Sequence, residues 1–590
     1  MRREGAGEKA GGGRLCLALC CLWWLLAATD AAHGAEPFAA LYPDPRLFEA
    51  ALAGPAPAAV PWRVTGLTVP HHLLAADMLA EAFSRLAGQG YRRIIVLCPD
   101  HYSRSRVPFA VADRDFETCL GPVAVDGEAV ARLRACPLVA PSGLFAREHG
   151  IQALTPFLAR FFPGAGLVAV AIAKTAKPAD WDVLGAALAP LLDGETLLVQ
   201  STDFSHYLPA AEARRMDQAT LRLLADPDPA GLAGLRQPGH VDSRGALYLQ
   251  RKLQKEVHGA EPVTVADRNS QDYAPARARR TTSYMVQYYG PRPAALPGPG
   301  RYVFAGDAFF GRHVARLLAR PGKREAFVAL VREATGGAPL ILNLEGVFAR
   351  RCPKGAGRFV LCMPTRESLD LLRAMGVKAV VLANNHAGDL GPAALQRTAR
   401  ALARAGIAPI LPGRVRDLGP FRLAALTDVD NRDPRRRGVL AGKAVDAVAR
   451  SGRGKPLFVM VHWGREFGPG PEDRERRLAD RLERAGAELL VGSHPHRTWP
   501  LTCDAHGCRA WSLGNFLFDQ SRPDADGGLL EVRFFPQGTY ALRSVAWGNP
   551  YRRLAKGDPA AKEGAAGNVG GEGADRATPS GEGRGRGAGR

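Results

Sequence analysis

Five short apolar runs in the second half of the chain each end in side chains that bind metals or move protons. The runs are rich in Val, Ile and Leu, which is typical of strands buried on both faces. Open α/β sheets place their sites at the carboxyl ends of their strands, so we expect these ends to meet in one crevice. The ends carry Asp307, Glu345, Asn385 with His386, His462, and finally His494 with His496.

This set of side chains predicts a metal site that holds more than one ion. Carboxylate, amide and imidazole ligands suit Mn, Fe or Zn better than Cu(I). Ions of this kind activate water and polarise substrate oxygens. For His494 and His496 taken alone, two histidines in a turn without a ligand are the alternative.

At 590 residues the chain is too long for one hydrophobic core, so two modules with appendages are expected. The formal charge of +20 is carried mainly by dispersed Arg, without long Lys/Arg blocks and without the aromatic signature of an RNA-binding module. This pattern favours an anionic partner, such as an envelope polymer or a peptide, and no nucleic acid is expected.

The N-terminus has the pattern of an export signal. A basic segment with Arg2, Arg3 and Lys9 precedes an apolar core at 15–28, and small residues surround Gly34. The core is short for a membrane span, so we expect a signal peptide at 1–34 and a mature chain from Ala35 with no stable span. The predicted location is the periplasm or the cell envelope.

Export places the cysteines in an oxidising compartment. Two close pairs, Cys352 with Cys362 and Cys503 with Cys508, each bracket a Gly-containing turn. A disulfide that staples a hairpin and a pair of free buried thiols are both open at each place.

The first module, 35–290, alternates strand and helix patterns and is predicted to be an α/β sheet. Histidines and carboxylates again follow the strands, which marks a second candidate site. Its members are His71, His101, Asp203 and His206 at strand ends, and Glu148 with His149 at a helix start.

Four segments of this module resemble the Memo family, the AmmeMemoRadiSam system protein B group, which shares its fold with class III extradiol ring-cleaving dioxygenases. The resemblance implies His71, His101 and His206 as ligands of a redox metal, iron or copper, with Asp203, Glu148 and His149 in the pocket. It also implies a radical SAM protein as partner. The segments are Pro70-His71, Pro99-Asp-His101, Glu148-His-Gly-Ile-Gln152 with Pro156-Phe-Leu158, and Ser201-Thr-Asp-Phe-Ser-His-Tyr207.

One position departs from that family. Relatives commonly carry a Cys before a Gly, whereas this chain has Asp242-Ser243-Arg-Gly245. Ser is a much poorer ligand for soft metals than a thiolate, so Ser243 is expected to shift the preference from Cu(I) toward Fe(II), Mn(II) or Zn.

After a Pro/Gly linker at 291–300, the second module, 301–552, resembles the CapA family of capsule and poly-γ-glutamate synthesis. The resemblance implies a calcineurin-like metallophosphoesterase fold, which is an α/β sandwich. The matching segments are Gly306-Asp307, Asn343-Leu-Glu345, Ala383-Asn-Asn-His386 with Asp389, His462-Trp-Gly464 with Glu466, Gly492-Ser-His-Pro-His496, and Ser512-Leu-Gly-Asn-Phe516.

The phosphoesterase analogy assigns roles to these residues. Glu345 would bridge two metals, and His386 would protonate a leaving oxygen. Phosphoesterases carry Asp-x-His at the first strand, but here Phe309 stands in the place of that His. The analogy places Asp307 and His496 on one metal, Asn385, His462 and His494 on the other, and Asn515 in the pocket.

The sequence thus predicts an exported two-domain metalloprotein with a disordered tail at 553–590. The CapA-like domain is expected to be a metal-dependent hydrolase or transferase acting on an anionic envelope polymer of the capsule or poly-γ-glutamate type. The Memo-like domain is expected to have a redox or a binding role. The alternative is a non-enzymatic protein that binds an envelope polymer or peptide.

Overall fold

A computed structural model describes most of the chain between Glu36 and Lys556. The described residues are 36–273, 280–291, 293–294, 296, 298–353, 359–431, 445–446, 448–450, 454–520 and 522–556. The predicted signal peptide lies outside these ranges, as does the predicted tail from residue 557 onward. Residues 553–555, which we expected in the tail, belong to the helix α17 (Pro550–Ala555).

The chain forms two compact units. Unit 1 contains the described residues up to Arg301 together with Leu501–Cys508 and Val532–Arg543. Unit 2 contains Tyr302–Pro500, Arg509–Glu531 and the described residues from Ser544 onward. The sequence predicts one module over 301–552, whereas two segments of that range belong to unit 1.

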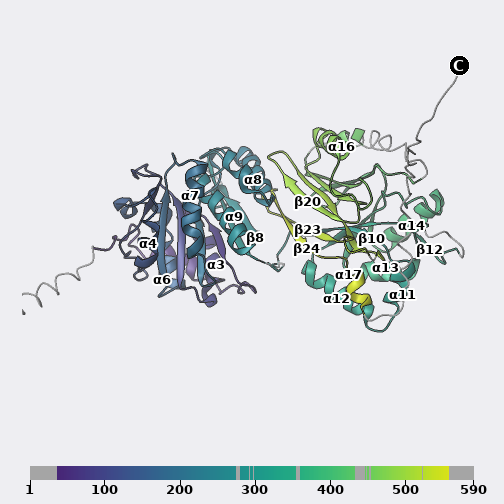
Figure 1. The fold of residues 1–590 in the computed structure, drawn as a ribbon, viewed down its shortest axis with the longest axis horizontal. Helices are drawn as coiled ribbons and strands as arrows, with labels where there is room; N and C mark the ends of the chain where they lie inside the picture. Colours follow the sequence, from purple (N-terminus) through teal and green to yellow (C-terminus); the bar gives the residue numbers. More distant parts are fainter. Residues whose placement is uncertain are drawn as a thin grey trace, which may run out of the picture. The chain divides into compact units, whose positions relative to one another are not determined.

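Unit 1 is built on a nine-stranded sheet (Figure 1). The strands follow the order β4-β3-β5-β2-β6-β1-β9-β7, and β8 pairs with β9. The central strands β5, β2, β6 and β1 run parallel, whereas β9 is antiparallel to β1. The strands are β1 (Gly66–Val69), β2 (Arg93–Pro99), β3 (Phe109–Val111), β4 (Val139–Pro141), β5 (Gly166–Ile172), β6 (Thr196–Ser201), β7 (His206–Leu208), β8 (Glu261–Asn269) and β9 (Thr281–Gly290).

Helices cover both faces of this sheet because its central strands are apolar on both faces. In β2, Ile94 and Val96 pack toward α3 and α6, whereas Ile95 and Leu97 pack toward α4, α7 and α9. The helices of unit 1 are α2 (Arg46–Leu52), α3 (Ala76–Ser84), α4 (Gly127–Leu133), α5 (His149–Gln152), α6 (Thr155–Phe161), α7 (Pro178–Leu188), α8 (Ala210–Ala225), α9 (Arg244–His258) and α10 (Ser270–Tyr273).

Two sheets pack face to face in unit 2. The first has the order β15-β14-β11-β10-β23-β24, with β22 on β10, and the second has the order β16-β17-β18-β19-β21-β20. The ring centroids of Phe304 in β10 and Phe458 in β18 are 6.1 Å apart, and the ring of Phe421 stacks on that of Phe458 with a centroid distance of 4.9 Å. The strands are β10 (Arg301–Ala308), β11 (Leu340–Leu344), β12 (Val347–Ala349), β13 (Cys362–Pro364), β14 (Val377–Val381), β15 (Ala408–Ile410), β16 (Val415–Asp417), β17 (Arg422–Thr427), β18 (Leu457–His462), β19 (Leu489–Ser493), β20 (Thr498–Cys503), β21 (Cys508–Leu513), β22 (Asn515–Leu517), β23 (Gly528–Phe534) and β24 (Tyr540–Ala546).

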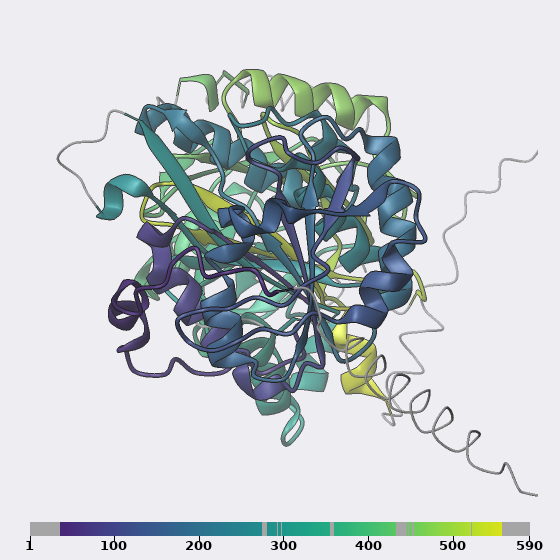
Figure 2. The same ribbon diagram turned by 90° about the vertical axis from the view of Figure 1, so that its left-hand side faces the viewer.

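The outer faces of both sheets are covered by helices. Residues of α12, α13 and α14 pack with β10, β11 and β14, and α16 packs on β17, β18 and β19. Figure 2 shows α16 (green) lengthwise. This arrangement is the α/β sandwich that the resemblance implied, so the predicted fold class is confirmed for both modules. The helices are α11 (Arg312–Leu318), α12 (Lys323–Thr335), α13 (Thr365–Ala374), α14 (Pro392–Arg404) and α16 (Asp473–Arg484).

The five apolar runs of unit 2 are strands, but they belong to two sheets. β10, β11 and β14 lie in the first sheet, and β18 and β19 lie in the second. The polar ends therefore converge from two sheets, not along one sheet edge as we had expected.

Disulfides join Cys352 to Cys362 and Cys503 to Cys508. Cys98, Cys119 and Cys136 are free. Within the described part of the chain, no helix is long and apolar enough to cross a membrane.

A buried carboxyl group lies in unit 1, on α8. Asp217 is fully buried and accepts hydrogen bonds from the hydroxyls of Ser205 and Ser283, each at 2.6 Å. Burial raises the pKa of Asp217 to about 6, although these two hydrogen bonds act in the opposite direction.

Replacing Asp217 by Asn should make the free energy of unfolding less dependent on pH. The pKa of Asp217 is higher in the folded protein than the value of about 3.9 in an unfolded chain, so the folded state binds more protons between the two values. Its stabilising contribution is complete below about pH 4 and is lost as the pH rises through about 6. Urea unfolding should show the wild type losing up to about 3 kcal/mol relative to the variant over this window. An identical pH dependence in both proteins would contradict the prediction, and the exposed Asp113→Asn serves as control.

Two candidate metal centres

Three strands of unit 2 bring together two carboxylates and an imidazole. Asp307 lies in β10, Glu345 follows β11, and His496 follows β19. Each of the three offers a ligand atom within 4.8 Å of the others, and all three side chains are buried. Together with Asn385, His462 and His494 we call them the unit 2 cluster.

The carboxylates of this cluster fit a divalent cation. Burial raises the pKa of Glu345 well above its usual value, and the neighbouring Asp307 and Glu466 raise it further. Burial also raises the pKa of Asp307, to about 6. Oε2 of Glu345 is buried and accepts no hydrogen bond. A buried oxygen without a partner costs free energy, and a bound cation would remove that cost.

The tautomer of His496 is set by Asn515, which begins β22. The Nδ2 amide of Asn515 donates to Gln520 at 2.9 Å, so its Oδ1 accepts from Nδ1 of His496 at 2.8 Å. Nε2 of His496 is then left as the ligand atom, 3.9 Å from Oε2 of Glu345. Asn515, expected in the pocket, thus lies behind the histidine and orients it.

The other half of the cluster surrounds His462, the last residue of β18. Nε2 of His462 lies 2.8 Å from Oδ1 of Asn385, and the His494 ring lies 4.7 Å from the His462 ring. The 2.8 Å between Nε2 of His462 and Oδ1 of Asn385 is also a separation that two ligand atoms of one ion adopt at bond lengths of about 2.0–2.2 Å. Burial and the neighbouring His494 lower the pKa of His462 well below its usual value, so its ring is neutral and able to bind a metal.

His386 lies beside Glu345 and is oriented by a carboxylate. Its Nδ1 is 2.8 Å from Oδ2 of Asp389, and its Nε2 is 3.6 Å from Oε1 of Glu345. Asp389 is itself held by the backbone N–H of Leu361, which donates at 2.7 Å. The sequence motif contained Asp389, but its role as the partner of His386 is visible only in the structure.

Asn343, Asn384 and Ser493 complete the hydrogen-bond network, and no motif in the sequence predicts a role for them. The Nδ2 amide of Asn343 donates to Oδ1 of Asp307 at 2.7 Å, and that of Asn384 donates to Oδ1 of Asn343 at 3.1 Å. Oγ of Ser493 lies 2.9 Å from Nδ1 of His462. Amides and hydroxyls at strand ends are common, so only their convergence identifies them.

Two glycines allow the backbones around the cluster to approach closely. A Cβ on Gly306 would lie 2.0 Å from the carbonyl oxygen of Gly514, and one on Gly492 would lie 1.9 Å from that of Trp511. Neither distance is possible, so both positions require glycine. His494 and His496 have φ values of 100° and 56°, a strained conformation for residues with a side chain.

Phe309 does not contribute a ligand. Its ring is buried against Phe518, with a centroid distance of 5.4 Å, and beneath the guanidinium of Arg312 at 4.8 Å. The third position of Asp-x-His is thus filled by apolar packing, as the departure in the sequence indicated.

Unit 1 contains a second cluster, which consists of His71 after β1, His101 after β2, and Asp242 before α9. Oδ2 of Asp242 lies 3.1 Å from Nε2 of His71 and 3.5 Å from Nε2 of His101. Oδ1 of Asp242 is buried and without a hydrogen-bond partner. We call these three donors the unit 1 cluster. Ligand atoms of His71 and His101 also converge with one of His149, and those of His71 and Asp242 converge with one of Asp203, so imidazole and carboxylate donors that suit a divalent metal meet at His71.

Partners behind the two histidines hold Nε2 toward this point. Nδ1 of His101 lies 2.6 Å from Oε1 of Glu148, and Nδ1 of His71 lies 3.2 Å from Oγ of Ser201, which donates its own proton to the carbonyl of Gly150. Burial would lower the pKa of His101, but Asp242 and Glu148 outweigh burial and raise it to about 9.

The other predicted residues of unit 1 surround this cluster. The ring of His149 stacks on His101 at 3.9 Å, and burial with the charge of His101 lowers the pKa of His149 to about 4. Oδ1 of Asp203 accepts from the backbone N–H of His71 at 3.1 Å. Glu148 caps α5 by accepting from the N–H of Gly150 at 2.8 Å.

Two expected members lie elsewhere. His206, in β7, is hydrogen-bonded through Nδ1 to the carbonyl of Phe204, and among the described residues it belongs to no group whose ligand atoms converge. Ser243 caps α9, because its Oγ accepts from the N–H of Ala246 at 3.2 Å. The residue that reaches the histidines is Asp242. It lies next to Ser243 in the segment that departs from the Memo family pattern, and this position was the signal in the sequence that could have identified it.

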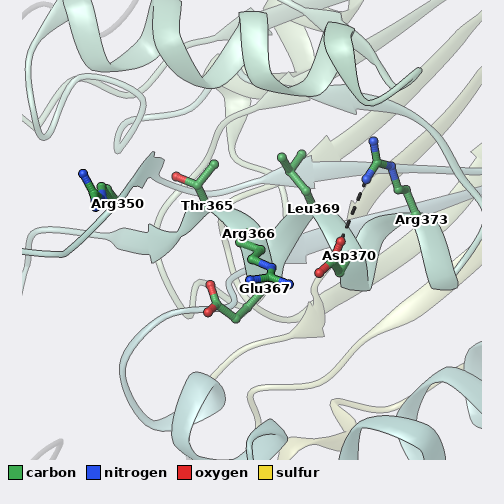
Figure 3. Close-up of a pocket in the computed structure, with 7 residues that line it drawn as sticks. All are labelled: Arg350, Thr365, Arg366, Glu367, Leu369, Asp370 and Arg373. Atoms are coloured by element: carbon green, nitrogen blue, oxygen red, sulfur yellow. Dashed lines mark ion pairs between the residues drawn. The ribbon is translucent and has the colours of Figure 1, made fainter.

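A cavity of about 520 Å³ lies apart from both clusters (Figure 3). None of the predicted site residues lines it, and the Arg373 guanidinium there pairs with Asp370 at 3.9 Å. Its lining residues are Arg350, Thr365, Arg366, Glu367, Leu369, Asp370 and Arg373. The mixture of both charges gives no preference for one kind of ligand.

Comparison with known proteins matches each module of the chain to a family. Residues 48–265 match the family model of the Memo-like protein, and residues 301–417 and 425–520 match that of the bacterial capsule synthesis protein PGA_cap. The chain joins a Memo domain to a PGA_cap domain. The Memo domain contains the unit 1 cluster, and the PGA_cap domain contains the unit 2 cluster.

Individual relatives match one domain each. The PGA biosynthesis protein CapA of Bacillus subtilis (strain 168) is 26% identical over 258 residues, which are 40% of this chain and 68% of the relative. A MEMO1 family protein of Methanopyrus kandleri is 28% identical over 197 residues, 31% of this chain and 68% of the relative. A probable polyglutamine synthesis accessory protein of Mycobacterium tuberculosis is 25% identical over 273 residues, 35% of this chain and 71% of the relative. The chain spans about two thirds of the length of the first curated relatives it matches.

Glu345→Gln should separate the stability of the metal-free protein from that of the metal-bound protein. The amide keeps the shape of Glu345 but removes a buried acid, so without metal the variant should melt at the wild-type temperature or above it. Mn²⁺ at 100 times its Kd should stabilise the wild-type cluster by about 2.7 kcal/mol, and should not stabilise the variant. Calorimetry in a His101→Ala background, which removes the unit 1 cluster, measures both. An equal Mn²⁺-induced shift in both proteins would contradict the prediction, and the exposed Glu333→Gln is the matched control.

Proposed function

We propose that the PGA_cap domain is a metal-dependent hydrolase or transferase acting on an anionic polymer of the cell envelope. The observation that carries the proposal is the convergence of ligand atoms of Asp307, Glu345 and His496, with the Asp389-oriented His386 beside Glu345. The polymer class is supported by relatives named for PGA biosynthesis and for polyglutamine synthesis. A polymer of the poly-γ-glutamate type also suits the strongly basic chain.

The residues divide the work of such a reaction. Asp307 and His496 would hold one ion, and Asn385, His462 and His494 a second, with Glu345 between them. Bound Mn, Fe or Zn supplies a polarising charge and a water of lowered pKa. Nε2 of His386 faces the cluster because Asp389 binds its other nitrogen, so a ring protonated on both nitrogens would donate its Nε2 proton to the leaving atom of the cleaved bond.

The same proposal places the protein outside the cytoplasm, in the periplasm or the cell envelope. Two disulfides suit an oxidising compartment, and the basic and apolar N-terminal pattern suits export. The rival function is a non-enzymatic protein that binds an envelope polymer or peptide and uses its metals only as structure.

His386→Asn should abolish turnover without loss of metal. Loss of a general acid lowers rates about 100-fold to 10,000-fold, whereas the ligands of the cluster stay intact. The measurement is the chain length of poly-γ-glutamate after incubation with the Mn²⁺-loaded protein, with metal content determined in parallel. Asp389→Asn should give a smaller loss, because it misorients His386 but keeps the ring. A wild-type protein that binds the polymer and never shortens it would favour the rival function.

For the Memo domain we propose a mononuclear iron site with a redox role. Two imidazoles and one carboxylate, as in the unit 1 cluster, are typical of non-haem Fe(II) oxygenases. The carboxylate of Asp242 is a hard ligand, so the preference over Cu(I) comes from Asp242 and not from Ser243. A binding role without turnover is the alternative, and a radical SAM partner stays a prediction from the family.

Asp242→Cys should raise the affinity for Cu(I) and lower that for Fe(II), because it places a thiolate beside His71 and His101. Ser243→Cys should leave both affinities unchanged and cost about 1 kcal/mol of stability through the lost cap of α9. His101→Ala should abolish binding of both metals. Competition titrations against chromophoric chelators measure the affinities. A rise in Cu(I) affinity with Cys at 243 but not at 242 would contradict the assignment.

A further inference from the structure

We propose that Glu466 is a ligand of the metal ion held by Glu345 and His496. The proposal rests on the metal-dependent function proposed for the PGA_cap domain and adds a residue to its centre. Glu466 lies in the loop that follows β18, four residues after His462. It is part of a motif that the phosphoesterase analogy leaves without a role.

The carboxylate of Glu466 faces the one free ligand atom of His496. Oε1 of Glu466 lies 4.0 Å from Nε2 of His496, and Oε2 of Glu345 lies 3.9 Å from the same nitrogen. Asn515 occupies Nδ1 of this histidine, so Nε2 is the atom available to a metal. An imidazole nitrogen with carboxylate oxygens of two residues at nearly equal distances is an arrangement that a metal ion bound among them would stabilise.

The loop that carries Glu466 is fixed to the turn that carries His496. The backbone N–H of Trp463 donates to the carbonyl of Ser493 at 3.0 Å, and the backbone N–H of Phe467 donates to the carbonyl of Pro495 at 2.9 Å. Phe467 has a φ of 58°, which a residue with a side chain keeps only when its surroundings hold it. The hydrogen bonds on both sides of Glu466 therefore keep its side chain next to His496.

The ion on this side of the cluster is short of one ligand, and Glu466 can supply it. Asp307, Glu345 and His496 give three protein donors, and Phe309 packs into the core where phosphoesterases have a fourth. The side chain of Glu466 is 53% exposed, whereas those of Glu345 and His496 are buried. Glu466 would thus reach such an ion from the solvent side.

The test is Mn²⁺ binding to the full-length, metal-stripped protein in the His101→Ala background, followed by the EPR signal of free Mn²⁺. The parent should bind two ions in the PGA_cap domain. Glu466→Gln should weaken one of them about 10-fold to 100-fold and leave the other unchanged. His496→Ala should weaken the same ion, and the double variant should lose less than the sum of the two single losses. Glu333→Gln, on an exposed face of α12, should bind both ions as the parent does.

Three results would overturn the inference, and only the third of them is also a failure of the proposed function. If the parent binds two ions and Glu466→Gln binds them equally well, Glu466 is no ligand and the proposed function stands. If the effect of Glu466→Gln disappears at about 1 M salt, where charges are screened within about 3 Å, the charge of Glu466 attracts the ion from a distance and Glu466 is no ligand. If the parent itself binds no Mn²⁺, the metal-dependent function fails together with the inference.

Discussion

The carboxylate of Asp307 is a buried point at which polar contacts join the two sheets of the PGA_cap domain. It extends from the first sheet and accepts a hydrogen bond from the backbone N–H of His494, which follows the last parallel strand of the second sheet. Asn343 of the first sheet binds its other oxygen. A buried carboxylate is tolerated only when its oxygens are satisfied, so the sheets have one relative position in which Asp307 is stable. The distances among the metal ligands follow from that position.

Both domains orient their histidines by the same means. A neutral or acidic acceptor binds Nδ1 from behind, and Nε2 is left to face the centre: Asn515 does this for His496, and Glu148 does it for His101. The difference lies in the third donor. In the Memo domain, Asp242 brings a charged oxygen to two imidazoles, whereas in the PGA_cap domain the carboxylates outnumber the histidines on one side. The two centres are therefore suited to different metals and different chemistry.

The sequence predicted the strands well because buried parallel strands have a strong compositional signal. Runs such as 457–462 and 340–344 became β18 and β11, and the polar residue at each end is where it was expected. The pattern records burial but not which sheet a strand joins, so the origin of the cluster in two sheets was not predictable. The direction of side chains was also not predictable. At the start of α9, Ser243 points to the helix backbone, whereas Asp242 before it points to His71. His206 was misplaced for a similar reason, since its ring turns back to its own backbone.

Two glycines of the PGA_cap motifs show how closely the backbones around the site approach one another. Gly306 and Gly492 have no chemistry of their own, yet each lies where a neighbouring carbonyl leaves no room for a side chain. A sequence comparison that matches Gly-Asp and Gly-Ser-His-Pro-His therefore detects the spacing of the backbone as well as the ligands. If only the ligand residues were transferred to another α/β sandwich, the donor atoms would be present, but the backbone segments that carry them would not come close enough to bring them together. Such a transfer therefore has to include the two glycines and the neighbouring backbone segments as well as the histidines.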